Sequence, residues 1–222
     1  MIALKQFYLN ELRECCYILS DETNECVIVD PGISSKSEQD RVVKYITTNS
    51  LKPVKLLCTS GHFDHTMGNA FITETYNIPT YIHPEDKELL TVTKRTCMMF
   101  GIIVNDPPLN TRDLKEGEDV TFGNTSLQVL HTPGHTHGSV CFYSPEDKLV
   151  LTGDTLFAGS CGRTDLPEGD NEKMFNSLVN ILVKKIKPDS AIYSGHGPNT
   201  TMVEELAHNP YLRASNWLGF LQ

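Results

Sequence analysis

The sequence predicts an α+β fold in which β-sheets are covered by helices. Two observations favour this class. Runs rich in β-branched and aromatic residues recur along the chain, and in each half a group of such runs is followed by a segment with helical periodicity. The chain of 222 residues also has no internal repeat, low-complexity tract or polar linker that would divide it. We therefore expect a single domain over residues 1–222.

The first half of the chain is predicted to begin with a β-hairpin, because two β-rich runs flank the polar turn DETN. Strands are expected at 14–20, 25–30, 54–58 and 79–82. Helices are expected at 37–49 and 67–77. Residues 84–116 follow no clean period, and we interpret them as an irregular insertion on the substrate side.

The second half is predicted to place several strands before its main helix. Strands are expected at 119–122, 125–131, 138–144, 148–153 and 190–194. Helices are expected at 171–186 and near 201–207. Strands followed by a helix in both halves indicate a sandwich of sheets with helices on the outside.

The charge balance excludes two classes of partner. Lys and Arg number 19 against 28 Asp and Glu, which leaves a formal net charge of −9. Proteins that bind nucleic acid or an anionic membrane surface carry an excess of positive charge on the binding face. We therefore expect a small-molecule substrate, no nucleic acid and no membrane.

The cysteines and the N-terminal segment indicate a cytoplasmic protein. The seven cysteines are an odd number and lie mostly inside apolar, strand-like runs, which is typical of reduced thiols. No CxxC spacing occurs, so a thiolate zinc site is not predicted. The segment MIALKQFYLNEL lacks both the basic and the apolar region of a secretion signal.

A first candidate metal-binding turn follows the strand predicted at 54–58. The stretch TSGHFDH brings His62, Asp64 and His65 within four residues. Imidazole and carboxylate groups are ligands of zinc and related metals, and a turn between a strand and a helix can direct several of them to one point. The alternative for this stretch alone is a solvated polar turn in which Asp64 caps a helix.

Three further predicted strands end in the same way. His135 lies in HTPGHTHGSV, Asp154 follows Gly153 at the end of strand 148–153, and His196 follows Gly195 at the end of strand 190–194. Ligands at the ends of several strands can converge at one edge of a sheet, where a rigid scaffold fixes their geometry. This recurrence favours a metal site over four unrelated polar turns.

These stretches resemble the motifs of a known family. TSGHFDH, HTPGHTHGSV, GDTLFAGSCGRTDLPEGD and SGHGPNTT are similar, in order and approximate separation, to the HxHxDH, TPGHTxGS, GDxLF and GHG motifs of the metallo-β-lactamase superfamily. GRTDLP and GHGPNTT look most like the short glyoxalase II-like (hydroxyacylglutathione hydrolase-like) group. The resemblance implies a four-layer αββα sandwich with the metal site at one edge of the sheets.

The resemblance also implies a metal-dependent hydrolase that acts on a small thioester or ester. It implies six ligands, namely His62, Asp64, His65, His135, Asp154 and His196. His62 and His135 would hold a first metal. Asp64, His65 and His196 would hold a second, and Asp154 would bridge the two. The expected cofactor is zinc, as one or two ions, with iron or manganese as alternatives. A metal-bound hydroxide would attack the carbonyl, and Asp64 would act as the catalytic residue that orients the water.

Ser60 departs from the family pattern, because it stands where the motif has its first histidine. A neutral hydroxyl is a poor zinc ligand beside imidazole, so the first site is expected to bind metal more weakly. Three interpretations remain: a natural divergence with an altered site, an introduced substitution, or a chain that has lost the chemistry. We favour an altered but occupied site. His137 is interpreted as a bystander rather than a replacement ligand.

Two alternative functions follow from this departure. His62, His135 and Asp154 form a two-histidine, one-carboxylate set that suits non-haem iron, and persulfide dioxygenases of the superfamily also carry a CGRTD sequence. Against this alternative, the chain retains the second-site ligands Asp64, His65 and His196, which a mononuclear enzyme does not need. The other alternative is a non-catalytic relative that still binds metal.

Further residues have weaker assignments. Asp30 either orients a metal-bound histidine or caps a turn. Arg163 and Asp165 are expected to pair and to hold the loop after Asp154. Met98, Met99 and Phe100, with Lys94 and Arg95, are candidates for the wall of the substrate pocket, and they are equally plausible as core and surface residues. We do not expect the C-terminal helical domain with which longer glyoxalase II enzymes bind glutathione.

Overall fold

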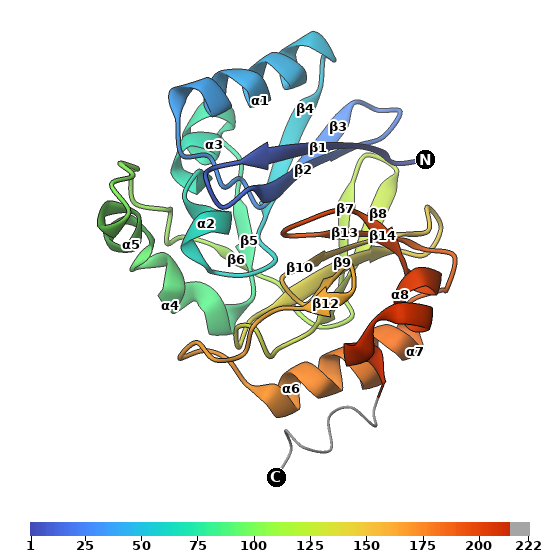
Figure 1. Ribbon diagram of the computed structural model, residues 1–222. Helices are drawn as coiled ribbons and strands as arrows, with labels where there is room; N and C mark the ends of the chain where they lie inside the picture. Colours follow the sequence, from blue (N-terminus) through green and yellow to red (C-terminus); the bar gives the residue numbers. More distant parts are fainter. Residues whose placement is uncertain (214–222) are drawn as a thin grey trace. The chain divides into compact units, whose positions relative to one another are not determined.

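The computed structural model describes residues 1–213 and comprises two compact units (Figure 1). The N-terminal unit consists of residues 1–114 and 120–126. The C-terminal unit consists of residues 115–119 and the chain from Leu127 onwards. Each unit contains a β-sheet with helices packed on it, and the single domain expected for the whole chain stays a prediction.

The sheet of the N-terminal unit has six strands in sequence order, from β1 to β6. They are β1 (Ala3–Leu9), β2 (Glu14–Ser20), β3 (Glu25–Val29), β4 (Lys52–Leu57), β5 (Thr80–Ile82) and β6 (Arg112–Asp113). The first three strands are antiparallel, as the predicted hairpin requires, and the last four are parallel. The parallel order brings the ends of β3 and β4 to the same edge of the sheet, so the residues that follow them lie close together.

The longer helices of this unit agree with the periodicity of the sequence. Helix α1 (Lys36–Thr48) begins at a capping box in which the Ser35 hydroxyl and the Glu38 carboxylate satisfy each other's backbone N–H groups. The helix expected at 67–77 is instead divided into α2 (Phe63–Thr66) and α3 (Asn69–Tyr76). The break lies near Gly68, where a Cβ would be 2.3 Å from the Pro31 carbonyl oxygen, so the chain passes too close for a side chain.

The interpretation of residues 84–116 as irregular was wrong in part. The segment contains a 3₁₀ turn η1 (Pro84–Asp86), helices α4 (Lys87–Leu90) and α5 (Thr93–Met99), and strand β6. Helices of four to seven residues span two turns at most, so their apolar residues cannot show a period.

The sheet of the C-terminal half has the strand order β14-β13-β10-β9-β8-β7. Its strands are β7 (Asp119–Phe122), β8 (Thr125–His131), β9 (Val140–Ser144), β10 (Leu149–Gly153), β13 (Ala191–Ser194) and β14 (Thr200–Thr201). β10 pairs with β13 in parallel, so both strands run towards the same edge of the sheet. Gly153 at the end of β10 and Gly195 after β13 allow the turns into the loops that follow. A small hairpin, β11 (Leu156–Phe157) and β12 (Ser160–Cys161), lies between β10 and the helices.

The helix predicted at 171–186 is present as three continuous pieces. They are α6 (Asn171–Phe175), a π-helical segment η2 (Asn176–Leu182) and α7 (Val183–Lys185). Asp170 caps the N-terminus by accepting the Lys173 N–H. Helix α8 (Met202–His208), which begins at the Thr201 cap, and a 3₁₀ turn η3 (Pro210–Leu212) follow.

Each unit has its own hydrophobic core. In the N-terminal unit Ile18, Ile28 and Leu56 of the sheet pack with Val42 and Ile72 of the helices. Burying one such aliphatic side chain contributes about 1.5–3 kcal/mol, so the helices hold the strand ends, and the loops that follow them, in fixed positions. In the C-terminal unit a separate cluster joins the sheet to the helix that begins at Asn171.

The thiols agree with the sequence expectation. All seven cysteines are free, and six of them are buried. Within the described part of the chain, no helix has the length and apolar character needed to cross a membrane.

Candidate metal centre

The ligand turn of the N-terminal unit runs from the end of β4 into α2. The helix begins at Phe63 with His62 as its N-cap residue, and no side chain caps it. Asp64 and His65 occupy the first turn and are buried, with His65 Nε2 4.0 Å from Asp64 Oδ2. The alternative in which Asp64 caps the helix was therefore wrong. Two potential ligand atoms approach each other instead.

Asp30 orients His65, which decides between its two predicted roles. The residue follows β3 and is buried, and its Oδ2 lies 3.1 Å from His65 Nδ1. Because an ionised carboxylate can only accept, Nδ1 carries the proton and Nε2 keeps its lone pair. Asp30 also accepts the backbone N–H of Thr59 at 2.7 Å and its hydroxyl at 2.5 Å. A carboxylate behind a histidine in this way is typical of metal-ligating histidines.

Ser60 and Asp86 accept hydrogen bonds from backbone N–H groups of the ligand turn. Ser60 is buried, and its hydroxyl accepts the His62 N–H at 3.4 Å. The Gly61 N–H donates to Asp86 Oδ2 at 2.7 Å, and a Cβ at Gly61 would lie 2.6 Å from the Asp86 carbonyl oxygen. Asp86 therefore fixes the backbone that carries the ligands. Sequence reasoning missed this residue, because it comes from a separate turn later in the chain.

Glu14 is a second residue that sequence reasoning missed. Its side chain is fully buried in β2, and neither carboxylate oxygen has a hydrogen-bond partner among the described residues. Its ligand atom lies within 4.8 Å of those of Asp30 and His65. Burial raises the pKa of the Glu14 carboxyl well above its usual range, nearby His65 lowers it, and Asp30 raises it further. The position of this glutamate at the start of the apolar run ECCYILS was the sequence feature that could have indicated a functional role.

Gly134 positions His135 in the C-terminal unit. The glycine has φ of 141°, and a Cβ there would lie 2.4 Å from the backbone nitrogen of Met174, so only glycine fits. His135 is buried, and its Nδ1 lies 2.9 Å from the Arg163 carbonyl oxygen. Since a carbonyl can only accept, Nδ1 carries the proton, and Nε2 is the ring nitrogen that could act as a metal ligand.

Asp154 brings together the three predicted ligands of this unit. Its Oδ2 lies 3.3 Å from His135 Nε2 and 3.7 Å from His196 Nε2. Asp154 follows β10 and His196 follows β13, so the parallel pairing of these strands places the two loops side by side. Ser194 donates its hydroxyl to the His196 carbonyl and holds that loop.

This donor set fits a metal cation. With its Nδ1 proton donated to the Arg163 carbonyl, His135 directs Nε2, which is an acceptor in the neutral ring, towards Asp154 Oδ2 at 3.3 Å. Two such acceptors repel each other unless a cation or a second proton lies between them. Imidazole nitrogen and carboxylate oxygen are the ligands that zinc and first-row divalent metals take.

The remaining candidates have the following surroundings. His137 is exposed, which agrees with its interpretation as a bystander. Arg163 and Asp165 form the expected bidentate ion pair, with both N–O distances at 2.7 Å. Burial raises the pKa of Cys161 to about 12 and raises that of Cys58 further, so neither thiol forms the thiolate that a nucleophile requires.

Three known proteins are similar to this chain in sequence or fold. A probable metallo-hydrolase, YqgX of Bacillus subtilis, is 35% identical over 88% of this chain and 90% of its own length. Hydroxyacylglutathione hydrolase GloC of Haemophilus influenzae is 32% identical over 92% of this chain and 95% of its own length. The crystal structure of TTHA1623 in a di-iron-bound form has a TM-score of 0.83 and 37% identity, and covers 94% of this chain and 100% of its own.

These similarities confirm the predicted metallo-β-lactamase-like fold and a kinship with metal-dependent hydrolases. The profile of the metallo-beta-lactamase superfamily matches residues 12–196, a stretch that contains every predicted ligand. The chain therefore belongs to the metallo-beta-lactamase superfamily.

Proposed function

We propose that the protein is a metal-dependent hydrolase that cleaves a small thioester or ester, in the manner of glyoxalase II. One observation carries the proposal. A single carboxylate oxygen of Asp154 faces the Nε2 atoms of both His135 and His196, at 3.3 and 3.7 Å. The relatives named as hydrolases support the reaction class, and the hydroxyacylglutathione hydrolase GloC supports the thioester bond.

The ligands that we propose are the six residues implied by the family resemblance. Asp154, His135 and His196 come from the C-terminal unit. His62, Asp64 and His65 come from the N-terminal unit. The metal is zinc, iron or manganese, since imidazole and carboxylate accept all three, and the di-iron form of TTHA1623 makes iron a serious candidate. Ser60 leaves the first metal with one imidazole fewer than the motif supplies.

The metal would supply the nucleophile, and side chains of the protein would position the metal ligands and the attacking water. A bound divalent metal lowers the pKa of a water ligand to about 7, which supplies hydroxide at neutral pH. Asp64 would orient such a water towards the substrate carbonyl. Asp30 keeps a proton of His65 on Nδ1, and the Arg163 carbonyl does the same for His135, so in each ring Nε2 is the atom that would bind the metal.

The substrate is a small molecule, and the protein acts in the cytoplasm. The seven free thiols support a reducing compartment. The net charge of −9 disfavours nucleic acid and anionic membranes as partners.

Hydrolysis after metal removal tests the proposal. Protein loaded with zinc, iron or manganese should hydrolyse S-lactoylglutathione or a simple acyl thioester, lose the activity on chelation and dialysis, and regain it with metal. Asp154→Asn should abolish hydrolysis. Asp147→Asn, which alters a half-buried carboxylate that accepts from the Ser144 hydroxyl in the same unit, should retain it.

Three outcomes would overturn the proposal. The first is hydrolysis that persists undiminished after chelation. The second is oxygen consumption on glutathione persulfide without thioester hydrolysis, which would identify a dioxygenase. The third is a metal content below one ion per chain after growth with all three metals, which would identify a non-catalytic relative.

A further inference from the structure

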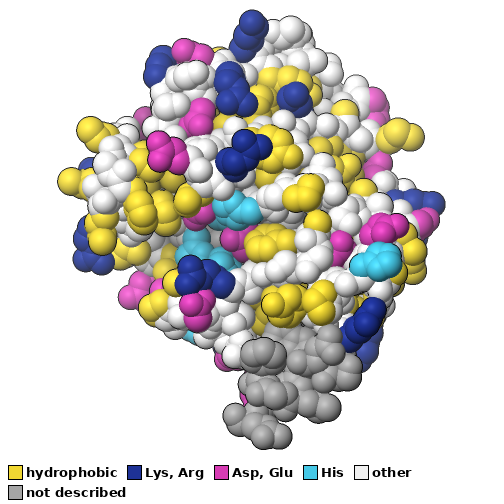
Figure 2. All heavy atoms as spheres, viewed as in Figure 1, with side chains coloured by type: hydrophobic (Ala, Val, Ile, Leu, Met, Phe, Trp, Pro, Cys, Tyr) yellow, Lys and Arg dark blue, Asp and Glu magenta, His cyan; other side chains and the backbone are white. Residues whose placement is uncertain are grey.

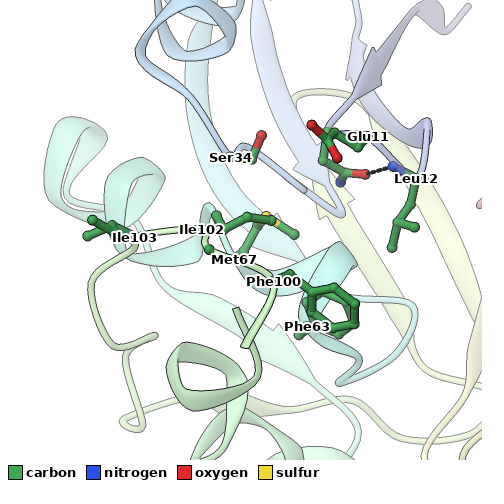
Figure 3. A pocket seen from close by; sticks show the side chains of 10 residues that line it. Glu11, Leu12, Ser34, Phe63, Met67, Phe100, Ile102 and Ile103 are labelled. Atoms are coloured by element: carbon green, nitrogen blue, oxygen red, sulfur yellow. Dashed lines mark hydrogen bonds between the residues drawn. The ribbon is translucent and has the colours of Figure 1, made fainter. Parts of the chain in front are cut away.

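A cavity of about 440 Å³ opens in the N-terminal unit beside the ligand turn (Figure 3). Its volume falls within the usual range of small-molecule sites. Six of the ten residues that line it have apolar side chains, among them Phe63, Met67, Phe100 and Ile102, while Asn10, Glu11 and Ser34 supply polar groups. In Figure 3 the rings of Phe63 and Phe100 lie one over the other, and Leu12 lies across from them.

The cavity wall is continuous with the predicted metal ligands. Phe63 stands between His62 and Asp64 in the sequence, and its ring stacks on Phe100 with centroids 5.2 Å apart and planes 3° apart. The Asn10 side-chain amide, also part of the wall, donates to the Asp64 carbonyl oxygen at 3.2 Å. A ligand in the cavity therefore lies next to the turn that holds Asp64.

The mouth of the cavity exposes apolar surface that a soluble protein normally buries. Phe100 is 65% exposed and Ile103 is 91% exposed, and both line the cavity. Met99, the last residue of α5, is 80% exposed but does not line the cavity. Figure 2 shows hydrophobic side chains gathered over α5 and the loop that follows it. Such a patch beside a cavity is typical of a binding site for an apolar group.

The charge of the lining limits what the ligand can carry. Among the described residues that line the cavity, Glu11 is the one ionisable side chain, and neither Lys nor Arg is present. A ligand carboxylate would meet like charge there and no cation to pair with. Glutathione carries carboxylates on its peptide, so this lining disfavours a glutathione carrier.

We propose that the cavity binds the apolar chain of an uncharged thioester or ester, with Phe63, Phe100 and Ile103 as the residues that determine specificity. The proposal rests on the proposed hydrolase function and names its substrate class. The apolar chain fills the cavity and stacks against the two phenyl rings, which places the adjacent carbonyl beside the turn that carries Asp64.

Binding of thioethers tests the proposal without any turnover. A thioether has no thioester carbonyl to hydrolyse, so its affinity is measured without turnover. The ligands are the S-ethyl, S-butyl and S-hexyl derivatives of N-acetylcysteamine, which are neutral, and S-hexylglutathione, which is anionic. Affinity is measured by isothermal titration calorimetry with the full metal-loaded protein.

The expected affinity rises about four-fold for each methylene that enters the cavity, which is the usual transfer free energy of a CH₂ group. S-hexyl-N-acetylcysteamine should bind more tightly than S-hexylglutathione. Phe100→Ala should weaken the neutral hexyl ligand about ten-fold or more, and the exposure of Phe100 means that folding should survive. Met99→Ala, the matched control, should change nothing. Glu11→Lys should favour S-hexylglutathione selectively.

Several results would overturn the proposal. They are an affinity that does not depend on chain length, a preference of the unaltered protein for S-hexylglutathione, and equal effects of Phe100→Ala and Met99→Ala. Self-association that Phe100→Ala abolishes would also contradict it, because the patch would then bind a second copy of the chain. Hydrolysis of the corresponding acyl thioesters is measured separately, so a failure of the hydrolase function is distinguished from a failure of the cavity to bind.

Discussion

Replacing Asp30 with asparagine should weaken metal binding through His65. The Asp30 carboxylate accepts three hydrogen bonds, from the Thr59 N–H, the Thr59 hydroxyl and His65 Nδ1, at 2.7, 2.5 and 3.1 Å. Asparagine has nearly the same shape but can accept at only one of its two terminal atoms. If its oxygen keeps the Thr59 N–H, its NH₂ group faces His65 Nδ1.

The expected magnitude follows from that exchange. Nδ1 must then accept rather than donate, so the proton of His65 moves to Nε2 and occupies the lone pair that would bind metal. Loss of such a supporting partner typically costs ten-fold to a hundred-fold in metal affinity, or about 1.4–2.7 kcal/mol. The free energy of unfolding should also fall by about 1.5–3 kcal/mol, the size of one hydrogen bond to a charged group.

Asp21→Asn is the matched control. Asp21 is also buried in the N-terminal unit, and it accepts from the Thr23 N–H and hydroxyl and from the Asn124 N–H, with no histidine among these donors. The control should lower stability and leave metal affinity unchanged. Metal affinity is measured by competition with a chromophoric chelator, and the His65 tautomer by nitrogen NMR. Equal metal affinities for Asp30→Asn and the unaltered protein would refute the role assigned to Asp30.

Three further predictions concern the same turn. Asp86→Ala removes the acceptor of the Gly61 N–H, so the free energy of unfolding in urea should fall by about 1.5–3 kcal/mol; an unchanged value would show that this bond contributes nothing. In the metal-free protein, folding raises the pKa of the Glu14 carboxyl well above its ordinary value of 4.5, so at pH values above 4.5 the folded state binds a proton that the unfolded state has lost. The free energy of unfolding should therefore fall as the pH rises from about 4.5 towards the folded-state pKa. Glu14→Gln should remove that slope in urea titrations at several pH values, and the same slope in both proteins would contradict the reasoning. Ser60→His should raise the metal content or affinity measured by elemental analysis; identical stoichiometry and affinity would remove Ser60 from the account.

Segments with a clear period could be predicted from the sequence. Strands β7 and β8 have the predicted bounds, and α1 is displaced by one residue at each end. Their apolar and polar residues alternate with a clear period, and turn or cap residues mark their ends. Strand β1 was not predicted, because Lys5 and Gln6 interrupt the apolar pattern of a strand at the sheet edge.

The candidate ligands could be predicted because they follow strands within short motifs. His135, Asp154 and His196 each come directly after a turn, and the structure brings these three together. The residues that support the ligands could not be found in this way. Glu14 and Asp86 reach the ligand turn through the packing of separate elements, so no local spacing reveals them.

The cavity could not be predicted from the sequence either. Phe63 and Phe100 come from different helices, and their stacking depends on how α2 and the end of α5 pack. The sequence indicated Phe100 as a candidate for the pocket wall, but it did not distinguish that role from core or surface positions. Short helices without a period left the segment around it unassigned.

The most direct test of the metal centre is an anomalous diffraction map of metal-loaded crystals, recorded at the absorption edge of the metal that the protein retains. The account predicts a peak at about 2.0–2.2 Å from Asp154 Oδ2 and from the Nε2 atoms of His135 and His196. A map with no peak there, or with its strongest peak at other side chains, would contradict the assignment of these residues as metal ligands.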